Sequence, residues 1–470
     1  MLWKSTPDAS TPTNTPPLFS GRDLLSLILP LILQQILSIT VGTVDSMMVS
    51  YAGEAAVSGV SLINTLDTLL ILVFTSLVSG GAVVVSQALG KKDPEHARAA
   101  VKQLLYAATG IAALLTLTVL LLRRPLLSLL FGTVEEEVMR SAEGYFFFVA
   151  LSFPFLAIES ANAASFRAMG NSMVSLKVSI LMNLVNIVGN AVLIYVFEWG
   201  AVGAAVATLC SRIVGAVVLT VLIHSKKNTV YIVHLFRYKP DWRVIRSILH
   251  IGIPNGIENG MFQFGKLLTQ TLVSTMPTAA IAANAVTNTL ANIQYMTGSA
   301  FSSAMVTVVG RCIGAKEREQ AKRYARLMVG LGYLSLAVVA LFTVLFAKPL
   351  IAVYDLSAES SMLAHRLILY HSLFAVVMWP IAFILPNAFR AASDVHFPLV
   401  ISMFSMWTFR VALSYLFSLE SVTVLGLFTL PGLGLGVMGV WFAMFADWIF
   451  RTVLFLIRYL GGRWLTVHAD

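Results

Sequence analysis

Charged side chains are scarce in this sequence. Asp, Glu, Lys and Arg make up only 12% of its 470 residues, whereas soluble globular domains carry about 25%. So few charges cannot cover a water-exposed surface of this size, which argues against a soluble protein. Cysteine is also rare, since Cys210 and Cys312 are the two in the chain. Their number and spacing exclude a disulfide framework and a cysteine-based metal site.

Long apolar runs fill most of the chain instead. Hydrophobic residues make up 57% of it, and the mean hydropathy is +0.82. A membrane-spanning helix needs about 20 mostly apolar residues, and the sequence holds twelve runs of that kind. They cover residues 24–50, 57–82, 101–122, 144–166, 173–197, 201–223, 246–275, 281–308, 325–347, 363–388, 397–418 and 435–459. We therefore predict an all-α integral membrane protein with twelve transmembrane helices.

The basic residues lie mainly in the short loops between these runs. The net charge of +9 could suggest a nucleic-acid partner, but this distribution is the one that membrane topology requires. Loops on the side of the N-terminus hold 23 of the 32 lysines and arginines, and loops on the other side hold five. This asymmetry predicts that both termini are cytoplasmic. We expect a multi-pass protein of the plasma membrane, such as a bacterial inner membrane, with no nucleic-acid partner.

The two halves of the chain repeat one another at a shift of 224 positions. The shift places Pro30 on Pro254, Gln34 on Glu258, Asn64-Thr65-Leu66 on Asn288-Thr289-Leu290, and Gly90 on Gly314. Each half has an even number of spans, so both halves start on the same side of the membrane. The repeats are therefore parallel and related by a pseudo-two-fold axis along the membrane normal. Transporters built in this way bind their substrate between the halves, near the midplane.

The repeat also sets the domain organisation that we predict. Residues 1–20 are rich in Pro and Thr and should form a disordered cytoplasmic tail. The N-lobe with spans one to six follows at 21–223, a cytoplasmic linker at 224–245, the C-lobe with spans seven to twelve at 246–460, and a second cytoplasmic tail at 461–470. No secretory signal pattern precedes the first span. We expect the first span itself to act as the insertion signal.

Several short motifs resemble one known family. They are Pro30 and Asp45 on the first span, the run 86–91 that ends the second, the run 166–171, and the pair Asn186 and Asn190 on the fifth. With their echoes in the second half, they resemble the multidrug and toxic compound extrusion (MATE) family over residues 20–460. The resemblance implies two six-helix lobes in a V shape around a central cavity. It also implies a monomer that exports small organic, often cationic compounds in exchange for H⁺ or Na⁺, with no other cofactor.

The first candidate site is an ion-coupling site around Asp45. An acid inside a membrane span is costly and is by default a functional-site hypothesis. A carboxyl group in a low-dielectric environment can take up a proton near neutral pH, and nearby amide oxygens could instead complete a shell for Na⁺. Span five supplies Asn183, Asn186 and Asn190, which share one helix face. The alternative is that these amides only join helices by hydrogen bonds.

The second candidate site is a substrate cavity lined by polar residues of several spans. Its predicted members are Gln34, Glu159, Asn162, Glu258, Asn259, Gln263, Lys266 and Asn288. Glu159 could equally form a structural bridge with Arg212, and the polar stripes of spans seven and eight could be packing contacts. Glu258 would attract cationic substrates unless Lys266 neutralises it. By contrast, Asp447 and Arg451 stand four residues apart on span twelve, where an intrahelical ion pair is the better interpretation.

These features together favour a secondary active multidrug exporter. The alternative is a lipid-linked oligosaccharide flippase of the same superfamily, which we would expect to need a strongly cationic cavity for pyrophosphate, whereas basic residues within the spans are few. We find no nucleophile, base or metal cluster at helical spacing. We therefore do not expect an enzyme.

Overall fold

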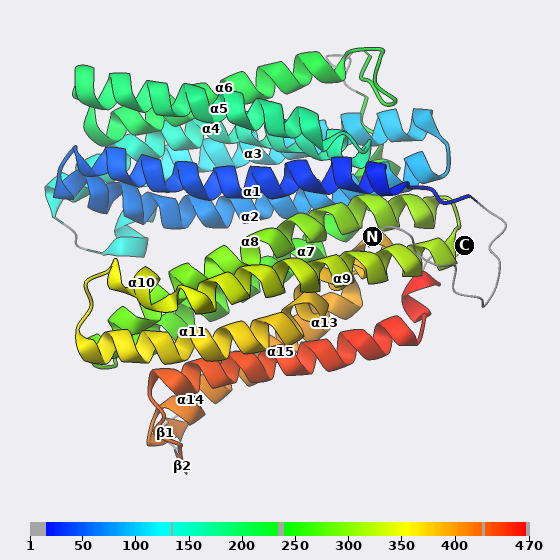
Figure 1. Ribbon diagram of the computed structural model, residues 1–470. Coiled ribbons are helices and arrows are strands. Elements are labelled where there is room, and N and C mark those ends of the chain that lie inside the picture. Colours follow the sequence, from blue (N-terminus) through cyan, green and yellow to red (C-terminus); the bar gives the residue numbers. More distant parts are fainter. Residues whose placement is uncertain (1–15, 133–134, 234–238, 425–427, 467–470) are drawn as a thin grey trace. The chain divides into compact units, whose positions relative to one another are not determined.

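The computed structural model describes residues 16–132, 135–233, 239–424 and 428–466. The predictions for the tail at 1–20, the linker at 224–245 and the tail at 461–470 therefore lie partly outside the described residues. Within the described ranges the chain is almost entirely helical (Figure 1).

The first half contains six helical segments, one for each predicted span. They are α1 (Gly21–Ser50), α2 (Glu54–Gly90), α3 (Pro94–Phe131), α4 (Glu136–Ala168), α5 (Ser172–Asn190) continued by the π-helical stretch η1 (Ala191–Val196), and α6 (Gly200–Ile223). Local signals fix several of the helix starts. Ser20 and Asp23 form a capping box at α1, and the Asp93 side chain accepts a hydrogen bond from the His96 N–H at α3. Both arrangements satisfy N–H groups that a helix start leaves unpaired.

The second half follows the same plan with more interruptions. Its helices are α7 (Trp242–Ser274), α8 (Thr278–Gly314), α9 (Arg318–Leu345), α10 (Ala347–Ala352), α11 (Ala358–Trp379), η2 (Pro380–Ile384), α12 (Pro386–Ala391), α13 (His396–Ser405), η3 (Met406–Ala412), α14 (Leu413–Ser418), α15 (Val437–Leu460) and η4 (Arg463–Leu465). The tenth predicted span corresponds to α11–η2–α12 and the eleventh to α13–η3–α14. The prediction of an all-α membrane protein with twelve helical spans is confirmed.

Helices α7 and α8 lack an apolar stretch of the kind that the other spanning segments have. Ten segments of the described chain are long and apolar enough to cross a membrane, and these two are not among them. Both carry the polar stripes noted in the sequence, such as Gln263, Lys266 and Gln270 on α7. A helix with a continuous polar stripe buries that stripe against protein or water rather than lipid.

The chain divides into two compact units. The first comprises Met1–Gly256 and Gly310–Glu317, and the second comprises Ile257–Val309 and Arg318–Asp470. In the first unit α4 packs against α2, α3 and α6, and α1 packs along α5 (Figure 1). In the second unit α15 packs against α11, α14 and η3. Both α7 and α8 contribute residues to each unit.

The ends of α2 and α8 cross within the first unit at a pair of glycines. A Cβ on Gly90 would lie 2.1 Å from the Arg311 carbonyl oxygen, and a Cβ on Gly314 would lie 2.0 Å from that of Gln87. Only glycine permits backbones to approach so closely. The shift of 224 converts Gly90 into Gly314 and Gln87 into Arg311. The two contacts are therefore equivalent under the internal repeat: each glycine lies against the backbone of the other half at the matching position.

A short β-hairpin joins α14 to α15 and was not predicted from the sequence. Strand β1 (Ser421–Val424) pairs antiparallel with β2 (Phe428–Pro431), and Ser421 lies opposite Pro431. The segment is rich in Val, Thr, Phe and Leu, which suit a strand. Polar and apolar residues alternate in both strands, but each strand has only four residues, which is too short a pattern to distinguish a strand from a loop.

Candidate functional site

The described structure brings Asp45 of α1 against the last turn of α5. The Asn190 side-chain nitrogen donates a hydrogen bond of 2.6 Å to Asp45 Oδ1. Asn186, one turn earlier on α5, can donate to both carboxylate oxygens at 2.7 and 3.3 Å when its amide nitrogen faces them, an orientation that satisfies both groups. Two of the three asparagines predicted for the ion site therefore surround the predicted acid.

Among the described residues, no positive charge pairs with the carboxylate at this site. In the described part of the chain no Lys, Arg or His side chain lies within 4.0 Å of Asp45. Asp45 is half-buried, whereas Asn186 and Asn190 are buried. Asn190 Oδ1 is also buried and has no hydrogen-bond partner among the described residues. The site thus combines an unpaired acid with a buried oxygen acceptor that remains unsatisfied.

Local backbone geometry changes at this same point. The regular α5 helix ends at Asn190, and η1 continues it with the wider π-helical hydrogen bonding from Ala191. π-helical turns are rare and occur frequently at functional sites. Nearer the start of both helices, the Gln34 side chain of α1 donates a hydrogen bond of 2.8 Å to Ser179 Oγ of α5. Gln34, predicted to line the cavity, therefore supports the pairing of the two helices that carry the acid and the amides.

Asn183 is the third asparagine of the predicted set and does not join this group. It is half-buried on α5, and no hydrogen bond links it to Asp45 within the described residues. The polar contacts around Asn186 extend instead to α6, because the end of the Asn186 amide that faces away from Asp45 lies 3.4 Å from Thr208 Oγ1. Thr208 was not predicted, and its small hydroxyl on an apolar helix gave no signal in the sequence.

A second polar cluster in the first unit centres on Arg212 of α6. Its guanidinium pairs with Asp67 of α2 at 3.0 Å and donates to Ser152 Oγ of α4 at 2.6 Å. The alternative that Glu159 bridges to Arg212 is therefore wrong in this structure. Arg212 pairs with Asp67 instead, and Glu159 accepts a hydrogen bond from the Ser160 hydroxyl. This cluster joins three helices and has the character of a structural ion pair.

Asn162 lies one turn after Glu159 on α4 and is fully buried. Its side-chain nitrogen donates to Thr220 Oγ1 of α6 at 3.0 Å. In this structure its contacts are those of a residue that joins two helices. The prediction that it lines a cavity gains no support from this environment.

In the second unit Glu258 of α7 pairs with an arginine that was not predicted as its partner. Arg390 of α12 lies 2.7 Å from the Glu258 carboxylate, and it also donates to Asn387. Lys266, which was considered as the neutralising group, has no carboxylate within 4.0 Å in the described chain. The repeated motif Phe-Arg-Ala at 166–168 and 389–391 could have pointed to Arg390.

The predicted pair of Asp447 and Arg451 on α15 is confirmed. Arg451 Nε lies 2.7 Å from Asp447 Oδ1, and Arg410 approaches the other carboxylate oxygen at 3.8 Å. Both guanidiniums also lie over the Phe262 ring, at 5.2 Å for Arg410 and 5.5 Å for Arg451. One buried carboxylate thus serves two arginines, and cation–π contacts hold both in place.

The remaining predicted cavity residues belong to the stripes of α7 and α8. Asn288 donates to the Asn284 carbonyl of its own helix at 2.9 Å, while Asn284 joins Gln270 at 3.2 Å and Trp441 at 3.0 Å. Lys266 is exposed and Asn259 and Gln263 are half-buried. Packing contacts thus account for Asn284, whereas a cavity role for Asn259, Gln263 and Lys266 stays a prediction.

Comparison with known proteins supports the repeat independently. A family model described as MatE matches residues 30–192 and 254–416. The two matched segments begin 224 residues apart and end 224 residues apart, which is the shift found in the sequence itself. The match covers more than half of the chain.

Individual relatives extend over almost the whole length. The chain is 26% identical to an uncharacterized transporter, YisQ, of Bacillus subtilis, with 94% of each chain covered. It is also 26% identical to the probable multidrug resistance protein NorM of Thermotoga maritima, over 94% of this chain and 93% of that one. Among solved structures, an outward-facing multidrug resistance MATE family transporter of the MOP superfamily matches with a TM-score of 0.83 at 18% identity, covering 94% of both chains.

Proposed function

Since the chain belongs to the MatE family of membrane transporters, we propose that it is a secondary active multidrug exporter driven by H⁺ or Na⁺ exchange at Asp45. Its substrates would be small organic compounds, cationic ones in particular. The family match supports transport rather than catalysis and gives no support to the oligosaccharide flippase alternative. We further propose a bacterial inner membrane location with both termini in the cytoplasm, on the basis of the basic loops.

The observation that carries the proposal is the unpaired acid at the contact between α1 and α5. An ion pair with arginine would lock a carboxylate in its charged form, as at Asp67 and Asp447. Among the described residues, the donors to Asp45 are the amides of Asn190, at 2.6 Å, and Asn186, at 2.7 Å. Neutral amides leave the negative charge available to a proton or a sodium ion.

Loading the site would change the hydrogen bonds that hold α1 to α5. The empty carboxylate is an acceptor and is satisfied by amide nitrogens. A protonated carboxyl group carries one donor and needs an acceptor, and a sodium ion needs several oxygen ligands. Either load therefore favours amide oxygens, such as the unsatisfied Asn190 Oδ1, turned toward Asp45.

This change can bias a conformational equilibrium because the empty and the loaded site differ in their contacts. A ligand shifts such an equilibrium only by its differential affinity for the two conformations. The π-helical turn that begins beside Asn190 offers a place where the α5 backbone can adjust. The energy supply is adequate, since one charge that crosses 100 mV releases about 2.3 kcal/mol.

The decisive variant is Asp45→Asn, measured in proteoliposomes. Efflux of the fluorescent cation ethidium would be followed under a pH gradient and a sodium gradient imposed separately. We expect the wild type to respond to one gradient at least, and Asp45→Asn to respond to neither, because an amide cannot alternate between charged and loaded forms.

Ser46→Ala is the matched control on the adjacent position. Within the described chain its hydroxyl donates to the Gly42 carbonyl of its own helix, so efflux should persist. Thermal unfolding in detergent would verify that both variants are folded. Ion-driven efflux by a folded Asp45→Asn variant at the wild-type rate would refute the assignment, and the gradient that drives the wild type would identify the coupling ion.

A further inference from the structure

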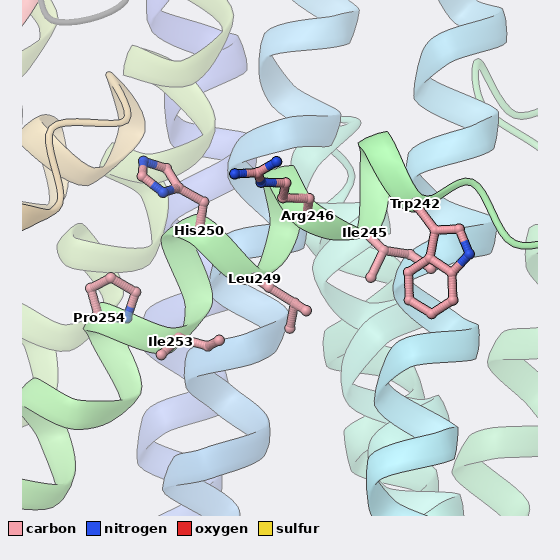
Figure 2. Close-up of a pocket in the computed structure, with 7 residues that line it drawn as sticks. All are labelled: Trp242, Ile245, Arg246, Leu249, His250, Ile253 and Pro254. Atoms are coloured by element: carbon pink, nitrogen blue, oxygen red, sulfur yellow. The ribbon is translucent and has the colours of Figure 1, made fainter.

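A surface groove runs along the first three turns of α7 and is separate from the site at Asp45. It has a volume of about 530 Å³ and is lined by Trp242, Ile245, Arg246, Leu249, His250, Ile253 and Pro254. Figure 2 shows these side chains on the helix, with Arg246 and His250 above it in this view and Leu249, Ile253 and Trp242 below it. All seven residues belong to the first unit.

The groove is amphipathic because two helical rows meet in it. Trp242, Arg246 and His250 follow one another at steps of four, and Ile245, Leu249 and Ile253 form the neighbouring row. The first row ends in polar groups and the second is apolar. Trp242 is 71% exposed and Ile253 is 53% exposed. Exposed apolar side chains beside a basic group are typical of contact with the lipid interface.

Arg246 brings a positive charge to the groove, and no ion pair with a described residue offsets it. No carboxylate lies within 4.0 Å of Arg246 in the described chain. The nearest acid in sequence is Asp241, and it is already used as a helix cap, since Asp241 Oδ1 accepts from the Arg243 and Val244 N–H groups at 3.0 and 3.4 Å. Arg243 is also exposed at this helix end. The N-terminal end of a helix adds further positive potential.

The geometry points to a binding site for one anionic phospholipid of the cytoplasmic leaflet. Its phosphate would lie against Arg246 and His250, an acyl chain along Leu249, Ile253 and Pro254, and the Trp242 ring at headgroup depth. Basic pockets on the cytoplasmic side of transmembrane helices suit anionic headgroups. This inference rests on the proposed orientation of the chain in the membrane and not on the proposed export.

The internal repeat provides a matched control within the same chain. The shift of 224 places Arg246 on Arg22, Ile253 on Leu29 and Pro254 on Pro30. The first-half copy differs in three respects. Leu18 stands in place of Trp242, Ser26 stands in place of His250, and Asp23 follows Arg22 directly, whereas Ser247 follows Arg246. Arg22 is therefore an exposed arginine in an equivalent place with an acid beside it.

Native mass spectrometry of the purified full chain would test the site. Wild type, Arg246→Gln and Arg22→Gln would each be titrated with phosphatidylglycerol and, separately, with phosphatidylcholine of the same acyl chains. We expect the wild type to prefer phosphatidylglycerol. Arg246→Gln should weaken phosphatidylglycerol binding about fivefold, the usual effect of one basic residue at an anionic surface, and leave phosphatidylcholine unchanged. Arg22→Gln should change neither.

Several results would overturn the inference. They are an unchanged phosphatidylglycerol affinity in Arg246→Gln, an equal loss of affinity in Arg22→Gln, or no preference between the two lipids in the wild type.

A protein dimer that Trp242→Ala dissociates would assign the groove to a second copy instead. The variant Ile253→Asn tests the acyl side, where weaker binding of phosphatidylglycerol is expected. Asp45→Asn should bind lipid normally, so a failure of the export proposal would be distinguishable.

Discussion

The glycine crossing of α2 and α8 leads to a sharp stability prediction. In Gly90→Ala the new Cβ would lie 2.1 Å from the Arg311 carbonyl oxygen and 2.9 Å from the Ala315 nitrogen. The first distance is about 1 Å shorter than real Cβ atoms tolerate, and the opposing atoms are backbone, so no side chain can turn away. Forcing extra volume into a packed contact costs about 1–3 kcal/mol. We expect the variant to be destabilised by that amount.

The assay is thermal unfolding of the purified protein in detergent at one scan rate, because large membrane proteins often unfold irreversibly. A loss of about 1–3 kcal/mol in the free energy of unfolding of the first unit corresponds to an unfolding midpoint several degrees lower. Gly314→Ala should behave alike, since its Cβ would lie 2.0 Å from the Gln87 carbonyl oxygen. The double variant should lose less than the sum, because separating the helices for one Cβ makes room for the other.

Gly110→Ala is the matched control for this prediction. Gly110 lies inside α3, and a Cβ there meets nothing within 4 Å. Alanine has the higher helix propensity, by up to about 1 kcal/mol, so this variant should be neutral or slightly stabilised. If Gly90→Ala unfolds at the same midpoint as Gly110→Ala, the close crossing of the two repeats does not exist in solution.

Two further predictions concern the buried ion pairs. Asp67→Asn should lower the free energy of unfolding by about 3 kcal/mol, because it leaves Arg212 without its carboxylate. Adding Arg212→Gln should restore part of that loss. Strictly additive shifts of the unfolding midpoint in the double variant would contradict the pairing. Glu258→Gln should destabilise the protein similarly by leaving Arg390 unpaired, again read from the unfolding midpoint. If Glu258→Gln instead kept full stability and lowered only ethidium efflux, Glu258 would act on substrates and not as the structural partner of Arg390.

Features that repeat along the chain were predictable. Ten of the spans follow from about 20 mostly apolar residues in succession, whereas α7 and α8 are interrupted by polar residues and were placed with the help of the repeat. Helix ends such as that at Ser20 and Asp23 follow from local capping. The internal repeat was visible as matched residues at one fixed shift. The hairpin at 421–431 was missed because two four-residue strands carry too little periodicity to distinguish them from a loop.

Partners of the polar residues were predicted less well. The pair of Asp447 and Arg451 was found because both lie on one helix, four residues apart. Arg212 was considered as one of two alternatives for Glu159, but it pairs with Asp67, which is 145 positions away. Glu258 meets Arg390, which is 132 positions away. Sequence spacing constrains contacts within a helix and says little about contacts between helices.

The sequence by itself determined the membrane class, the number and place of the spans, the two-fold repeat and the choice of Asp45 as the acid to examine. These depend on hydrophobicity, loop charge and spacing, which are local along the chain. Only the tertiary structure decided that Asn190 and Asn186 face Asp45 while Asn183 does not. It also decided that no arginine of the described chain pairs with Asp45. Such contacts depend on the rotation and offset of packed helices, and a shift of a few ångströms in either would exchange one partner for another.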